Sequence, residues 1–127
     1  MKILGIGVDV IKNKRIQSLI KNKNFIQRTF SENEVKFSKN KHNKINYFSK
    51  RFAAKEAFVK SIGTGFRNDL NFKDISINND KLGKPMIVID NKLNLLIKKK
   101  FKINNYNFFL SLADEKNHSI AFVIFQR

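Results

Sequence analysis

Three side chains in this sequence could together bind a metal ion and a phosphate: Asp9, Glu56 and Lys60. Carboxylate oxygens, phosphate oxygens and water are the ligands that Mg²⁺ prefers, because the ion is small, hard and reluctant to lose its waters. Lys60 follows Glu56 by one helical turn and could contact a phosphate or a leaving oxygen. Spacing alone favours a simpler interpretation, an i,i+4 ion pair between Glu56 and Lys60 worth about 0.2–0.5 kcal/mol. These residues alone therefore support a magnesium–phosphate site only as a hypothesis.

The composition excludes several other kinds of catalytic site. The sequence has no cysteine, so it can form no disulfide, thiolate zinc site or thiol nucleophile. Its two histidines, His42 and His118, lie in loop-like stretches where we expect them to be solvated. There is no convincing Ser/His/Asp set, and covalent nucleophilic catalysis is therefore poorly supported.

The stretch 47–65 must position two of the three candidate residues, and it is predicted to be an amphipathic helix with a glycine-rich exit. Apolar residues recur at four- and three-residue steps, and no Gly or Pro interrupts the stretch before Gly63, the expected end of the helix. The stripe consists of Phe48, Phe52, Val59 and Ile62. Lys55 falls near the middle of this stripe, where a lysine costs free energy unless it is paired or reaches water. We expect Lys55 to meet a buried phosphate or carboxylate, or to emerge at a subunit interface.

Asp9 belongs to a predicted first strand, residues 2–11. Leu4, Ile6, Val8 and Val10 alternate onto one face, and the opposite face carries two glycines beside the aspartate. Such a bare surface allows a ligand or another backbone to approach closely. A helix packed against the two glycines is an equally good interpretation.

The remaining elements complete one predicted α+β domain, residues 1–127, with an antiparallel sheet and a long central helix. Ser31 and Glu34 form a capping box that begins a helix ending at about Ser38. Residues 66–71 are expected to be irregular. Further helices are predicted over 12–23, 25–30 and 91–102, strands over 74–79 and 86–89 around a Gly83-Lys84-Pro85 turn, and a closing hairpin over 107–113 and 119–125.

The formal net charge of +16 indicates an acidic partner. RNA, an acidic protein and a phosphorylated small molecule are all partners that a positive charge would attract. The basic residues are spread along the chain instead of gathered in one arm.

No apolar run approaches the roughly 18 residues that a membrane span needs. The apolar part of the N-terminal stretch is also too short for a signal peptide. We therefore expect a cytoplasmic protein.

Two motifs resemble those of the holo-acyl-carrier-protein synthases, the short bacterial type of 4′-phosphopantetheinyl transferase. They are Gly5–Ile11 (GIGVDVI) and Arg51–Gly65 (RFAAKEAFVKSIGTG), and weaker matches extend over nearly the full length. The resemblance implies Mg²⁺-dependent transfer of the phosphopantetheine arm of coenzyme A to a serine of an apo acyl carrier protein, with release of adenosine 3′,5′-bisphosphate. It also implies a homotrimer with each active site between two subunits.

The resemblance assigns roles position by position. Asp9 and Glu56 are implied as magnesium ligands, and Glu56 and Lys60 as catalytic residues, although a metal-bound water could replace Glu56 as the base. The implied coenzyme A contacts are Arg51, Lys55, Lys60, Ser61, Gly63, Thr64, Gly65, Lys84, Pro85 and Asp114. Many relatives have histidine where Asp114 stands, so this carboxylate is expected to accept a hydrogen bond from the coenzyme or to act through a lysine.

Carrier proteins are acidic, so basic residues of the first helices are candidate docking residues. They are Arg15, which falls at the family's usual arginine, together with Lys14, Lys21 and Arg28. A small basic RNA-binding protein is the alternative from another class. It is disfavoured because the aromatic residues have core spacing and no RNP-type strand motif is present.

Overall fold

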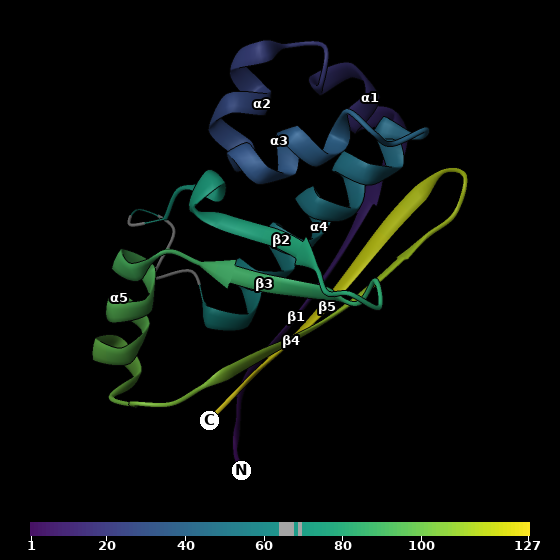
Figure 1. Cartoon of the computed structure of the whole chain (residues 1–127). Coiled ribbons are helices and arrows are strands. Elements are labelled where there is room, and N and C mark those ends of the chain that lie inside the picture. The colour runs from purple at the N-terminus through teal and green to yellow at the C-terminus, as the bar shows by residue number, and fades with distance from the viewer. Residues whose placement is uncertain (64–67, 69) are drawn as a thin grey trace.

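The computed structural model describes residues 1–63, 68 and 70–127, and it has the predicted α+β class (Figure 1). Three antiparallel strands form one sheet in the order β1-β5-β4, and β2 and β3 form a separate hairpin. The elements are β1 Ile3–Lys12, α1 Asn13–Leu19, α2 Lys23–Thr29, α3 Glu32–Ser38, α4 Lys44–Ile62, η2 Phe72–Asp74, β2 Ile75–Asn79, β3 Pro85–Ile89, α5 Asn91–Phe101, β4 Asn107–Asp114 and β5 His118–Gln126.

Local sequence signals set most of these boundaries. The Ser31 hydroxyl accepts from the Glu34 backbone N–H, and the Glu34 carboxylate accepts from the Ser31 N–H, so the predicted capping box begins α3. The Asn43 side chain caps α4, which begins at Lys44, three residues before the predicted start at residue 47. Gly63 ends α4 with a positive φ of 96°, a conformation that favours glycine.

Helix α4 packs against the three-stranded sheet through the glycines of β1. A Cβ on Gly5 would lie 1.9 Å from the Ser61 carbonyl oxygen, and a Cβ on Gly7 would lie 1.9 Å from that of Ala57. The glycine face of β1 is therefore covered by a helix of the same chain. Of the two interpretations that the sequence left open, the packed helix is correct, and neither a ligand nor a neighbouring subunit lies against these glycines.

The opposite face of the sheet is apolar and exposed. Val8 pairs with Phe122, and Val10 pairs with Ile120, in the β1–β5 register. Six large apolar side chains on this face are between 39% and 60% exposed: Ile6, Val8, Val10, Phe109, Ile120 and Phe122. An apolar face of this extent on a single chain is typical of a surface that another protein covers.

The core lies between α4 and the inner face of the sheet. Phe58 of α4 is fully buried and packs on Phe108 of β4, which stacks in turn on Phe125 of β5. Helices α1, α2 and α3 gather at one end of the molecule, around the first half of α4 (Figure 1). Among the described residues, no helix combines the length and the apolar character needed to cross a membrane.

Candidate active site

Asp9 and Lys60 meet between β1 and α4. The Lys60 ammonium donates to Asp9 Oδ1 at 3.1 Å and to the Val8 carbonyl oxygen at 3.0 Å. The Asp9 side chain is only 18% exposed, whereas that of Lys60 is 50% exposed. The contact brings together two of the three residues on which the predicted chemistry depends, from positions 51 residues apart.

The packing of β1 on α4 places Glu56 in the same region. Gly5 lies against Ser61 and Gly7 against Ala57, so two residues along the strand correspond to about one turn back along the helix. By the same spacing, Asp9 lies opposite the part of α4 near Ala53. Glu56 lies in α4 between Ala53 and Lys60. Two carboxylates with a nearby ammonium fit a Mg²⁺ ion whose other ligands are phosphate oxygens and water. No group of three or more metal-binding side chains occurs among the described residues, so substrate oxygens and water would have to complete such a site.

Arg51 is a buried cation with no carboxylate partner among the described residues. It is 7% exposed, and its guanidinium donates to Asn79 Oδ1 at 2.9 Å and to the Tyr47 carbonyl oxygen at 3.4 Å. Its carbon Cζ lies 3.7 Å from the centre of the Tyr47 ring, and its Nε has no hydrogen-bond partner. Burial lowers the pKa of Arg51, because desolvation disfavours the charged form. A buried cation with an unused donor calls for an anion in the adjoining space.

Two adjoining hollows lie beside Arg51, of about 410 and 300 Å³. They share Lys50, Arg51, Asn79 and Asp114. Lys84 of the β2–β3 turn and Pro85, the first residue of β3, line the larger hollow. Four of the residues predicted to contact the coenzyme therefore come together here: Arg51, Lys84, Pro85 and Asp114.

Lys50 is a residue of this region that sequence reasoning missed. Its ammonium lies 3.6 Å from Asp114 Oδ1, and the Asn46 side-chain amide donates to Asp114 Oδ2 at 2.7 Å. The Asp114 carboxylate is thus engaged by its own chain, and Lys50 is the lysine through which it could act on the coenzyme. The available signal was the position of Lys50, immediately before Arg51.

Lys55 does not line this region, and its predicted contact with the coenzyme is wrong. The side chain is fully buried, and its three N–H donors reach Glu34 Oε1 at 2.5 Å and the carbonyl oxygens of Thr29 and Phe72 at 2.8 Å. No donor is left for a ligand. Burial lowers the pKa of the Lys55 ammonium, and the Glu34 carboxylate opposes that shift. The buried carboxylate that the sequence called for is Glu34.

Ser61 is a second correction. Its side chain is 4% exposed, and its hydroxyl donates to the Phe58 carbonyl oxygen at 2.7 Å within α4. The adjoining Gly63 is half-buried and ends the helix. Thr64 and Gly65, also predicted to contact the coenzyme, lie outside the described residues.

The four predicted docking residues are exposed on or beside α1 and α2. The guanidinium of Arg15 lies over the Phe52 ring at 5.7 Å, and that of Arg28 lies over the Phe25 ring at 5.7 Å. Lys14 and Lys21 are exposed, at the start of α1 and after its end. These contacts hold the two guanidinium groups against apolar rings and leave them accessible to an acidic partner.

The two groups of candidate residues lie on different sides of α4. Lys60 bonds to β1, whereas Arg51 bonds to Asn79 at the end of β2. Nine residues separate them, which is about two and a half helical turns and so about half a revolution. Within one chain, the Asp9–Lys60 region and the Arg51 region therefore face away from each other.

The chain is similar to known proteins over nearly its full length. The family model of the 4′-phosphopantetheinyl transferase superfamily matches residues 5–123. A holo-[acyl-carrier-protein] synthase of Pelagibacter ubique is 58% identical over 127 residues, covering 100% of this chain and 99% of the relative. The crystal structure of the Neisseria meningitidis holo-[acyl-carrier-protein] synthase has a TM-score of 0.88 at 36% identity, covering 99% and 100% of the two chains. A Bacillus anthracis synthase solved in complex with coenzyme A (3′,5′-ADP) has a TM-score of 0.80 at 30% identity, covering 98% and 96%.

Proposed function

The chain belongs to the holo-[acyl-carrier-protein] synthases of the 4′-phosphopantetheinyl transferase superfamily, and on that premise we propose that it transfers the 4′-phosphopantetheine group of coenzyme A to a serine of an apo acyl carrier protein. The observation that carries the proposal is the contact between Asp9 and Lys60, because it joins the two family motifs at one place. The RNA-binding alternative is set aside, since the relatives reported above are synthases.

Asp9 and Glu56 would hold the Mg²⁺ ion at the junction of β1 and α4. When bound, the ion neutralises charge on the coenzyme's pyrophosphate. The serine oxygen of the carrier protein forms a bond to the phosphorus that bears the pantetheine arm, and the bond from that phosphorus to the bridging oxygen breaks. Glu56 or a water molecule takes the serine proton. Lys60 stabilises or protonates the departing adenosine 3′,5′-bisphosphate. This chemistry consists mostly of positioning and charge stabilisation, and it needs no nucleophile from the enzyme.

Arg51, Lys84, Pro85 and Asp114 would contact the nucleotide end of the coenzyme, together with Lys60, Gly63, Thr64 and Gly65 nearer the transferred group. The unused Nε donor of the buried Arg51 supports this assignment, because a phosphate in the adjoining hollow would supply an anion directly beside the guanidinium. Lys50 adds a second cation there. Arg15, Lys14, Lys21 and Arg28 would dock the acidic carrier protein.

We propose a homotrimer with each active site between two subunits. The exposed apolar face of the sheet supports assembly with further copies of this chain. Because the Asp9–Lys60 and Arg51 regions face away from each other, the Arg51 region of one copy can complete the Asp9–Lys60 region of its neighbour. Light scattering of the purified protein should give three times the chain mass. Phe122→Glu, which buries a charge in the proposed interface, should lower that mass.

Residues 1–127 would form one transferase domain, and the family match over residues 5–123 supports that assignment. A cytoplasmic location and a role in fatty acid and lipid biosynthesis accord with an acyl carrier protein as partner.

The direct test is the mass of an apo acyl carrier protein after incubation with the enzyme, coenzyme A and Mg²⁺. We expect a mass gain of one phosphopantetheine group, and the absence of that gain with folded enzyme would refute the proposed function. Asp9→Ala and Glu56→Gln should each abolish turnover and weaken Mg²⁺-dependent binding of coenzyme A in calorimetry. Glu32→Gln on the exposed side of α3 is the matched control and should change neither.

A further inference from the structure

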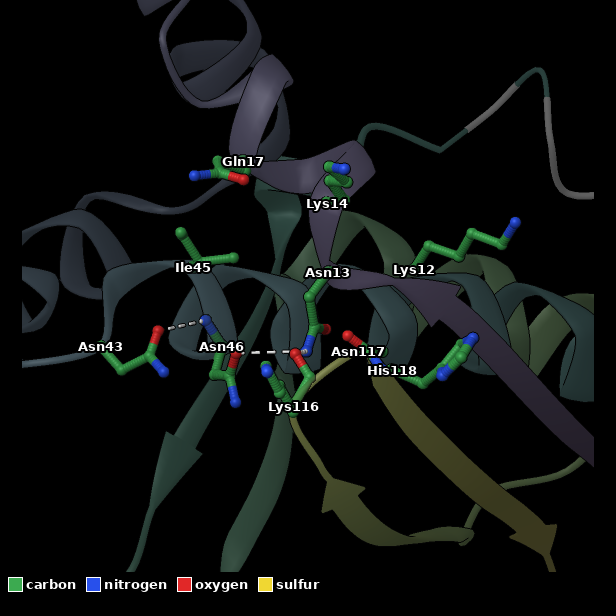
Figure 2. Close-up of a pocket in the computed structure, with 10 residues that line it drawn as sticks. All are labelled: Lys12, Asn13, Lys14, Gln17, Asn43, Ile45, Asn46, Lys116, Asn117 and His118. Carbon is green, nitrogen blue, oxygen red and sulfur yellow. Dashed lines mark hydrogen bonds between the residues drawn. The ribbon is translucent and has the colours of Figure 1, made fainter.

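A third hollow, of about 540 Å³, lies at the end of the molecule where β1 enters α1 and the β4–β5 turn approaches the start of α4 (Figure 2). We call it the hairpin hollow. Its cationic lining residues are Lys12 and Lys14 from the β1–α1 junction and Lys116 from the turn. The remaining lining residues are amides, one histidine and one isoleucine, and none is acidic. The charge that faces this space is therefore positive.

Asn13 fixes the shape of the hairpin hollow. It is 3% exposed, and its side-chain amide donates to the carbonyl oxygens of Glu115 and Lys116 at 3.0 and 3.2 Å and to Asn46 Oδ1 at 3.2 Å. The Ser119 hydroxyl donates to Asn13 Oδ1 at 2.7 Å. One buried side chain thus ties the β4–β5 turn to α1 and α4, and the turn is held in place as one wall of the hollow.

The one carboxylate of the turn is engaged within the turn. Glu115 Oε1 accepts from the Asn117 backbone N–H at 3.0 Å and lies 2.8 Å from His118 Nδ1. None of the ion pairs among the described residues involves Lys12, Lys14 or Lys116. The Asp114 carboxylate beside the hollow is engaged by Lys50 and by the Asn46 side-chain amide. An acidic group from outside would meet cations without displacing an internal partner.

The hairpin hollow is close to the proposed reaction centre. Lys12 follows Asp9 by three residues in the same strand, which is about 10 Å. His118, across the sheet from Lys12, lies three residues from Ala121, the partner of Asp9. A protein interface of standard size covers about 800 Å² on each partner, a patch of about 16 Å radius. A carrier protein that delivers its serine to Asp9 and touches α1 is therefore large enough to reach the hairpin hollow as well.

We propose that the β4–β5 turn is a second docking arm for the carrier protein, and that an acidic side chain of the carrier enters the hairpin hollow between Lys14 and Lys116. The proposal rests on the proposed function, because it takes the apo acyl carrier protein as the partner. It assigns a binding role to the turn, whereas the sequence pointed only to basic residues of α1 and α2.

Charge reversal in the turn tests the proposal. Lys116→Glu should raise the KM for the carrier protein about tenfold at low salt, with the KM for coenzyme A unchanged, because the substitution opposes an acidic partner at the rim of the interface. Lys92→Glu, which makes the same charge change on α5, is the matched control and should leave both constants unchanged. Equal effects of the two substitutions on the carrier KM would overturn the proposal.

A second measurement does not depend on turnover. Since the chain has no cysteine, Asn117→Cys carries a single site for a photo-cross-linking label, and the side chain of Asn117 makes none of the bonds that hold the turn. The label at position 117 should cross-link to apo carrier protein, and the same label on Lys92→Cys should not. Equal yields would overturn the proposal. If the wild-type enzyme failed to modify the carrier, the proposed function would fall instead, and the cross-linking comparison would still decide whether the turn docks it.

Discussion

Gly7 of β1 lies so close to Ala57 of α4 that a Cβ on the glycine would be 1.9 Å from the alanine's carbonyl oxygen. Strand and helix therefore meet backbone to backbone, with no side chain between them at this point. That approach brings the Asp9 carboxylate within reach of the Lys60 ammonium. The glycines act on the candidate active site through the spacing of two elements, without themselves contacting a ligand.

Gly7→Ala is expected to destabilise the protein by about 3 kcal/mol, at the upper end of the cost of overpacking, because α4 and β1 must separate to admit the methyl group. Urea unfolding measures the change. Asn105→Ala, at an exposed position between α5 and β4, is the control and should leave the free energy of unfolding within about 0.5 kcal/mol of wild type. A Gly7→Ala protein as stable as the control would contradict the close packing.

Lys55→Met should lower the free energy of unfolding by about 3–5 kcal/mol, since it leaves the buried Glu34 carboxylate without its cation. The double variant Lys55→Met/Glu34→Gln removes that charge as well, and we expect it to be more stable than the single variant. Urea unfolding of the wild type, both single variants and the double variant gives the coupling energy. If the single and double variants were equally destabilised, the ion pair would not be the source of the effect.

Lys50→Met is expected to raise the KM for coenzyme A about tenfold with little change in kcat, because hydrogen bonds to charged groups contribute about 1.5–3 kcal/mol. Steady-state kinetics with varied coenzyme A and saturating carrier protein measure both constants. The control is Lys92→Met, which removes the same charge from the exposed side of α5. A KM that rises equally in the two variants would exclude a specific role for Lys50.

The two tyrosines predict a loss of stability in strongly alkaline solution. Burial raises the pKa of both Tyr47 and Tyr106 above the ordinary value of 10.0. The folded protein therefore keeps phenol protons that the unfolded chain releases. The contribution of the two phenols to the free energy of unfolding is complete below pH 10 and is lost as the pH rises further. Near-ultraviolet absorbance should show less phenolate in the folded protein than in denaturant at pH 10. Coincident titration curves would contradict the prediction.

The sequence by itself determined the elements and the family. Period-two and helical patterns located the strands and the central helix to within a few residues, because local propensity and capping groups such as Ser31 act over one turn of chain. The two motifs named Asp9, Glu56 and Lys60 as partners. Charge and spacing alone would have left Glu56 and Lys60 as an ordinary ion pair.

Only the tertiary structure decided which side chains have free atoms to offer a ligand. Lys55 belongs to the same motif as Lys60, yet Glu34, Thr29 and Phe72 use all of its donors, and those partners come from segments that no local pattern connects to α4. Lys50 lies beside the candidate coenzyme hollow through its ion pair with Asp114, which is 64 residues away in the sequence. The glycine face of β1 was bare in the sequence and covered in the fold. In each case the deciding contact joins residues distant in the chain, and burial, not residue type, sets what remains available for chemistry.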